Sequence, residues 1–71
     1  MSEYLVVIEG EGDTWSAYVP DLPGCVSAGS SREEVEQLIR EAIHLHVELM
    51  REYGDPVPPP SARAAIVVEV A

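Results

Sequence analysis

The fold is decided by the stretch Tyr18–Ser31, which reads Tyr-Val-Pro-Asp-Leu-Pro-Gly-Cys-Val-Ser-Ala-Gly-Ser-Ser. It ends one strand pattern, turns, starts another strand and opens a helix. Pro20 and Pro23 lack a backbone donor and favour extended geometry in the residue before them, so neither fits inside a central strand or a helix. We therefore predict a tight turn at Leu22–Gly24, with the Asp21 side chain bonded to the backbone just ahead of it.

Two strands are predicted before this turn. Residues 3–9 include the β-branched run Tyr4–Ile8, which is apolar at both parities, as in a strand covered on both faces. A polar, glycine-rich connection follows at residues 10–13, and residues 14–20 then alternate apolar and polar side chains. We expect these two strands to pair antiparallel, with a short third strand over residues 24–28.

A helix is predicted over residues 31–53. Ser31 with Glu34, or Ser30 with Glu33, forms the Ser-x-x-Glu pattern that satisfies two backbone donors at a helix start. Apolar and amphipathic side chains then recur at spacings of three and four, which indicates one stripe covering a face of the sheet. The stripe consists of Val35, Leu38, Ile39, Ala42, Ile43, His46, Leu49, Met50 and Tyr53.

A proline strap and a final strand are predicted after the helix. Residues 55–60 contain four prolines and should run as stiff polyproline II. Residues 63–70 place apolar side chains on alternate positions and predict a strand that must pair, in its own sheet or with a neighbouring subunit. The fold class is therefore α+β in the order β-β-β-α-β, a single domain over residues 1–71 with one helix across an antiparallel sheet.

Self-association is expected from the size of the chain. A chain of 71 residues buries only about 60% of the surface that its unfolded form exposes. Leu45 and Val47 widen the apolar sector of the helix beyond what one sheet contact requires. We predict a homodimer or higher homo-oligomer, with Leu45, Val47, Ile66 and Val68 at the interface.

The composition points away from nucleic acid and towards a basic partner. The formal net charge is −9, from thirteen Asp and Glu against four Arg, and the chain contains no Lys. Phosphate binding needs clustered basic side chains, whereas an acidic surface steers basic partners and also keeps a small protein in solution. From their expected exposure we select Glu11, Asp13 and Asp21 as candidate partner contacts. The single cysteine and the short apolar N-terminal run predict a cytoplasmic protein outside the membrane.

No constellation of residues predicts catalysis, a metal or a cofactor. His44 and His46 point to opposite sides of a helix and cannot share an ion. Cys25 with His46 could form a nucleophile and base, but a buried apolar role for the thiol is favoured. Four carboxylates, of Glu9, Glu11, Asp13 and Asp21, leave open the alternative of a degenerate metal-dependent nuclease.

The ordered features of the chain resemble the HicB-like antitoxin family from Leu5 to about Pro60. The resemblance rests on a strand ending in the signature turn, on Ser30 and Ser31 with a Glu-rich helix start, and on a Gly-Asp-Pro-x-Pro-x-Pro exit. The signature turn consists of Tyr18, Pro20, Asp21, Leu22, Pro23, Gly24 and Cys25.

This resemblance implies a partial ribonuclease H-like fold and a protein-binding module that is not an enzyme. It implies that the module neutralises a basic HicA-type toxin, which cleaves messenger RNA, by covering its active surface. We expect a short single-domain member without the C-terminal DNA-binding segment of longer members. The remaining alternative is an orphan binding domain with no toxin.

Overall fold

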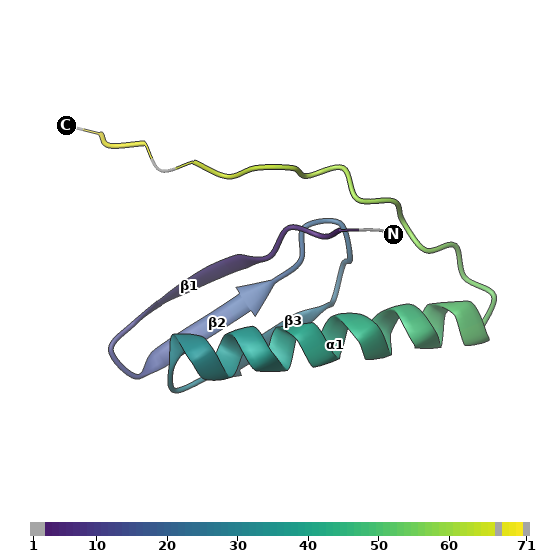
Figure 1. The fold of residues 1–71 in the computed structure, drawn as a ribbon, viewed down its shortest axis with the longest axis horizontal. Helices are drawn as coiled ribbons and strands as arrows, with labels where there is room; N and C mark the ends of the chain where they lie inside the picture. Colours follow the sequence, from purple (N-terminus) through teal and green to yellow (C-terminus); the bar gives the residue numbers. More distant parts are fainter. Residues whose placement is uncertain (1–2, 67, 71) are drawn as a thin grey trace.

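The part of the chain that the structure describes, residues 3–66 and 68–70, holds three antiparallel strands and one long helix (Figure 1). In this computed structural model the strands are β1 (Val7–Glu11), β2 (Thr14–Tyr18) and β3 (Val26–Gly29), in the order β1-β2-β3. Helix α1 (Arg32–Glu52) packs across one face of this sheet. The predicted α+β class and the antiparallel meander are confirmed.

The signature turn folds as two successive β-turns that share Leu22. The Leu22 N–H donates to the Val19 carbonyl at 3.1 Å, and the Cys25 N–H donates to the Leu22 carbonyl at 3.0 Å. Each turn has a proline at its second position, where the fixed φ of proline is favourable. Gly24 has φ +84°, as the third position of a type II turn requires. The turn predicted at Leu22–Gly24 is confirmed, and Leu22 is fully buried at its centre.

The hairpin between β1 and β2 closes with a two-residue loop, Gly12 and Asp13. Gly12 has φ +61°, as expected at the first position of a type II′ turn. At Gly10 the strands come so close that an added Cβ would lie 2.6 Å from the Thr14 carbonyl oxygen and 2.7 Å from the Trp15 ring. The sequence signal that predicted this hairpin therefore reflects a steric need as well as a turn preference.

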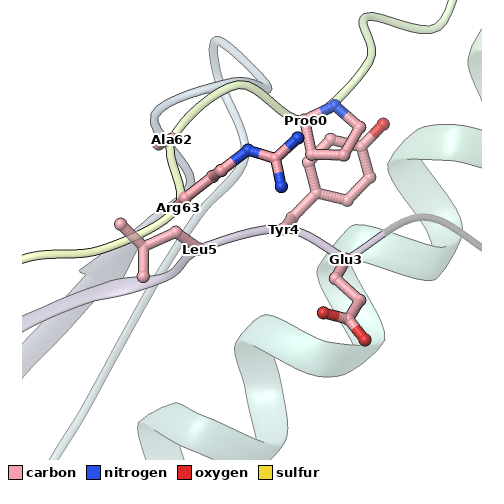
Figure 2. A pocket seen from close by; sticks show the side chains of 6 residues that line it. All are labelled: Glu3, Tyr4, Leu5, Pro60, Ala62 and Arg63. Carbon is pink, nitrogen blue, oxygen red and sulfur yellow. The ribbon is translucent and has the colours of Figure 1, made fainter.

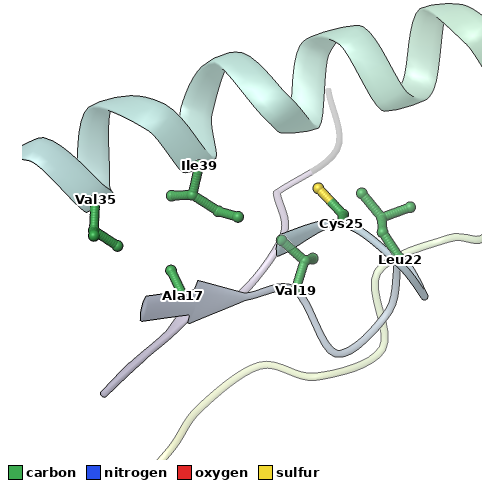
Figure 3. Packing of buried hydrophobic residues seen from close by; sticks show 6 residues of the cluster. All are labelled: Ala17, Val19, Leu22, Cys25, Val35 and Ile39. Carbon is green, nitrogen blue, oxygen red and sulfur yellow. The ribbon is translucent and has the colours of Figure 1, made fainter. Parts of the chain in front are cut away.

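The core lies between the sheet and one face of α1. It consists of Ala17, Val19, Leu22, Cys25, Val35 and Ile39, each at most 3% exposed (Figure 3). The signature turn contributes Leu22 and Cys25, so it is part of the core as well as a change of direction. The Ser27 hydroxyl donates to the Val35 carbonyl at 3.3 Å and ties β3 to the first turn of α1.

Both ends of α1 are capped by local chemistry that the sequence predicts. The Ser31 hydroxyl accepts the Glu34 N–H at 3.1 Å, while the Glu34 carboxylate accepts the Ser30 N–H at 3.1 Å. At the other end Gly54 has φ +74°, its N–H donates to the Arg51 carbonyl, and the Asp55 N–H donates to the Met50 carbonyl. These two bonds form a Schellman motif. The helix predicted over residues 31–53 is confirmed to within a residue at each end.

The predicted strand boundaries need correction. The strand predicted over residues 3–9 begins only at Val7, because β2 ends at Tyr18, opposite Val7, and leaves residues 3–6 no partner in β2. The strand predicted over residues 14–20 stops at Tyr18 because the chain turns at Pro20, which has no N–H to donate. The third strand begins at Val26, since Cys25 still closes the second turn.

The predicted final strand over residues 63–70 is wrong for this chain by itself. The described residues of this segment, 63–66 and 68–70, belong to no strand, and Val67 lies outside the described residues, as do residues 1, 2 and 71. The sheet that the described residues form consists of β1, β2 and β3, so no backbone ladder includes this segment. The strap itself is extended as predicted and runs back along the molecule past the N-terminal segment (Figure 1).

Candidate protein-binding surface

Acidic side chains gather where the hairpin ends. Glu9, Glu11 and Asp13 line one open hollow together with Trp15. The three acidic residues are exposed, whereas Trp15 is half-buried, and the Trp15 Nε1–H donates to the Gly12 carbonyl at 2.9 Å. Trp15 thus fixes the loop that carries Asp13. The hairpin presents carboxylates beside an aromatic ring, which suits a basic side chain of a partner protein.

Asp21 has a role within the chain that the sequence did not reveal. Its carboxylate accepts hydrogen bonds from the Ser61 N–H at 3.0 Å, the Ser61 hydroxyl at 2.6 Å and the Ala62 N–H at 3.0 Å. The expectation that Asp21 bonds the backbone just ahead of it is wrong, because these donors lie forty residues further along the chain. The prediction that Asp21 contacts a partner remains untested beside this internal role.

These hydrogen bonds hold the pKa of Asp21 below its ordinary value. The Ser61 hydroxyl contributes most, followed by the Ala62 and Ser61 N–H groups, while partial burial acts weakly in the opposite direction. Each bond favours the ionised carboxylate because a carboxylate is a stronger acceptor than a protonated carboxyl group. Asp21 is therefore an ionised anchor for the strap at neutral pH.

The strap has a second anchor near the N-terminal segment. The Tyr4 hydroxyl donates to the Pro58 carbonyl. Tyr4, Pro60 and Arg63 line a pocket of about 430 Å³ that Glu3, Leu5 and Ala62 complete (Figure 2). Sequence reasoning missed the roles of Tyr4, Ser61 and Ala62. The only hint of the Asp21 link in the sequence is a serine directly after the proline run.

The four carboxylates considered for a nuclease do not all meet at one place: Glu9, Glu11 and Asp13 line the hairpin hollow, and Asp21 does not. Asp13 precedes β2 and Asp21 follows it, so the full length of that strand separates them. Within residues 3–66 and 68–70, no three His, Cys, Asp or Glu side chains lie together as the ligands of one metal ion would. The geometry that two-metal phosphoryl chemistry needs is therefore not assembled by the described acids.

Cys25 and His46 line the same shallow hollow between β3 and α1. Cys25 is only 3% exposed, and burial raises the pKa of its thiol. A raised pKa keeps the thiol protonated and is the opposite of what a nucleophile needs. The expectation of a buried apolar role for Cys25 is confirmed, and His44 lies exposed on α1 while His46 is half-buried.

The predicted interface residues occupy different environments. Val47 is half-buried and packs against the core, whereas Leu45 is 58% exposed on α1. Ile66 and Val68 are 83% and 69% exposed on the segment after the strap. The structure thus brings Val47 into the chain's own packing and leaves the other three side chains open to solvent.

Fold and surface together define a class: a small α+β domain whose charge is strongly negative and whose described acids form no metal site. No helix in the described residues is both long enough and apolar enough to cross a membrane. The chain belongs to the HicB-like antitoxin family of bacterial toxin-antitoxin systems, whose model matches residues 4–70. The resemblance noted in the signature turn is confirmed.

Relatives share the domain across bacteria, archaea and a phage. The chain is 30% identical over 66 residues to a UPF0150 protein of Thermoplasma acidophilum, covering 92% of this chain and 96% of that protein. It is 43% identical over 56 residues to a UPF0150 protein of Synechocystis, covering 78% and 71%.

A third relative is longer than this chain. An uncharacterized 14.9 kDa protein of Haemophilus phage HP1 is 40% identical over 55 residues, which cover 78% of this chain but only 41% of the phage protein. No solved structure matches the chain significantly.

Proposed function

We propose that this domain is an antitoxin that binds a small basic HicA-type toxin and covers the surface with which that toxin cleaves messenger RNA. The observation that carries the proposal is the family match over residues 4–70. The net charge of −9 supports it, because a protein that binds RNA presents positive charge and an acidic partner competes with RNA for that surface. The encounter would take place in the cytoplasm, and the domain would act by blocking, without chemistry of its own.

We place the toxin contact at the hairpin end, on Glu11 and Asp13. Both side chains are exposed, and both lie beside Trp15 in the hollow of the hairpin. The Asp21 carboxylate already accepts three hydrogen bonds from residues 61 and 62, so it offers a partner less acceptor capacity than Glu11 and Asp13 do. An arginine or lysine of the toxin would meet two carboxylates and an aromatic ring at one place.

The test is co-expression of this chain with the basic protein encoded by an adjacent reading frame. We expect the two proteins to co-purify, the toxin's RNA cleavage to stop, and the complex to weaken as salt is raised. The double variant Glu11→Gln/Asp13→Asn should weaken binding about tenfold or more, as expected for the loss of charge-assisted contacts.

The matched control is Glu48→Gln/Glu52→Gln, which removes the same formal charge from exposed positions of α1. Equal weakening by both double variants would show that only the net charge matters and would refute the hairpin contact. Failure of the native chain to bind or inhibit any basic protein of its genome would refute the antitoxin role and leave an orphan binding domain.

A further inference from the structure

The segment that follows the strap is apolar and leaves the body of the molecule. Ile66, Val68 and Val70 occupy alternate positions and are 83%, 69% and 87% exposed. Beyond the anchors at Pro58, Ser61 and Ala62, residues 63–66 and 68–70 run apart from the helix and the strands (Figure 1). The radius of gyration is accordingly 13.5 Å, against about 11 Å expected for a globular chain of this length. Three apolar side chains at alternate positions would share one face if this segment paired as a strand.

A groove of matching chemistry lies at the outer edge of β1. The sheet order β1-β2-β3 leaves one side of β1 without a strand partner among residues 3–66 and 68–70. A shallow groove of about 190 Å³ lies between this strand and α1. It is lined by Ile8 of β1, Val6 just before β1, and Ile39 of α1. Glu36 and Arg40 form its rim. The groove therefore combines unpaired backbone groups with an apolar floor, as a site for an added strand does.

The segment is long enough to pair along the whole of β1, and it carries little charge. Residues 64–70 would span about 23 Å as a strand, which exceeds the length of the five-residue β1. Glu69 is their only ionisable side chain. In a chain of net charge −9, this is a surface on which two like-charged copies can approach each other without bringing many acids together.

We propose that two copies of this chain exchange these segments: residues 64–70 of each copy add as a strand to the free edge of β1 of the other. Ile66 and Val68 then cover the groove formed by Val6, Ile8 and Ile39. Each chain has one segment and one groove, so reciprocal exchange closes at two copies and leaves neither part unfilled.

The second copy is favoured over the chain's own groove by the position of the strap. Asp21 and Tyr4 hold the root of the segment, and the segment then projects into solvent instead of returning to its own β1. Exchange of an identical element across such a hinge adds apolar burial without a new fold. The inference does not depend on the antitoxin role.

The test combines molar mass with amide hydrogen exchange on the full chain, over a wide range of protein concentration. We expect light scattering to give twice the 7.7 kDa chain mass. Amides of β1 and of residues 64–70 should gain protection together as the concentration rises. The variant Ile66→Asp/Val68→Asp should raise the dimer dissociation constant at least about a hundredfold, because it places charge in an apolar contact. Both side chains are exposed in the single chain, so the variant should still fold.

Leu45→Asp is the matched control, since Leu45 is 58% exposed on α1 and distant from β1 in the sequence. It should leave the dimer intact. The proposal is overturned if residues 64–70 are protected at monomer mass, which would place the segment in its own sheet. It is equally overturned if Leu45→Asp dissociates the dimer and the tail variant does not, or if the native chain stays monomeric and unprotected at high concentration.

Discussion

At the scale of single residues, the fold depends most on side chains that make contacts distant in the sequence. Leu22 is buried because two turns deliver it inward, and Asp21, beside it in the sequence, points outward to the strap. Two adjacent residues of the signature turn thus have different roles: Leu22 packs in the core, and Asp21 bonds the chain just after the strap. The proline pair makes this possible, since each proline fixes the second position of its own turn.

Asp21 should titrate at unusually low pH, and its protonation should release the strap. Its folded pKa lies below the unfolded value of about 3.9. The stability that it contributes is therefore fully present above that value and is lost as the pH falls through the lower folded pKa. In an NMR titration, the amide shifts of Ser61 and Ala62 should move together with a midpoint below that of an ordinary Asp.

Ser61→Ala removes the largest contribution to this shift and should raise the midpoint towards the ordinary value. Asp13→Asn, an exposed carboxylate at the other end of β2, is the control and should not move it. Amide shifts of Ser61 and Ala62 that do not respond to acid would show that the anchor does not form in solution.

At the scale of elements, helix α1 begins and ends where local chemistry dictates. The Schellman motif at Gly54 ends α1 and sends the chain into the strap. At the start of α1, the choice between the two overlapping Ser-x-x-Glu patterns is settled in favour of Ser31 and Glu34, although the Glu34 carboxylate bonds the N–H of Ser30. The next residue back, Gly29, leaves the space that this carboxylate occupies.

The two serines at the helix start should therefore differ sharply in energetic weight. Ser31→Ala removes the side-chain acceptor of the Glu34 N–H and should lower the free energy of unfolding by about 1 kcal/mol in urea denaturation. Ser30→Ala is the matched control, because Ser30 takes part through its backbone N–H and should cost only about a few tenths of a kcal/mol. If both variants lose the same free energy of unfolding, Ser31 is not the residue that caps α1.

At the scale of the whole molecule, the protein consists of one helix packed on one sheet and carries a large excess of negative charge. Among the residues that the structure describes, six are buried apolar residues of the core. Among the described residues one ion pair is formed, Arg32 with Glu36 at 3.1 Å, so thirteen acids are balanced by little local attraction. Mutual repulsion of these acids opposes folding and also keeps copies apart except at apolar surfaces.

Salt should therefore stabilise this protein. Screening weakens repulsion between exposed charges, so the thermal midpoint at neutral pH should rise as sodium chloride is added to a dilute sample. Near pH 4.3, the isoelectric point of the sequence, the rise should largely disappear because the net charge is then close to zero. A midpoint that falls with salt at neutral pH would mean that attractive ion pairs dominate the electrostatics.

How far the sequence predicts this protein depends on the range of each interaction. The turn at Leu22–Gly24, the caps of α1 and the hairpin all follow from residues within a few positions of one another, and all are confirmed. The candidate site was predictable in part. The acidic character of the hairpin follows from Glu11 and Asp13, but the sequence did not predict that Trp15 fixes the hairpin loop.

The sequence by itself determined the family, the α+β order up to the helix end, and the acidic character of the surface, because propensity, turn chemistry and charge are local properties. Only the tertiary structure decided that Asp21 anchors Ser61 and Ala62, that Val47 packs inward, and that residues 63–66 and 68–70 form no strand. These outcomes depend on which groups the folded backbone brings within hydrogen-bond reach, and a partner forty residues away leaves no periodic signal in the sequence.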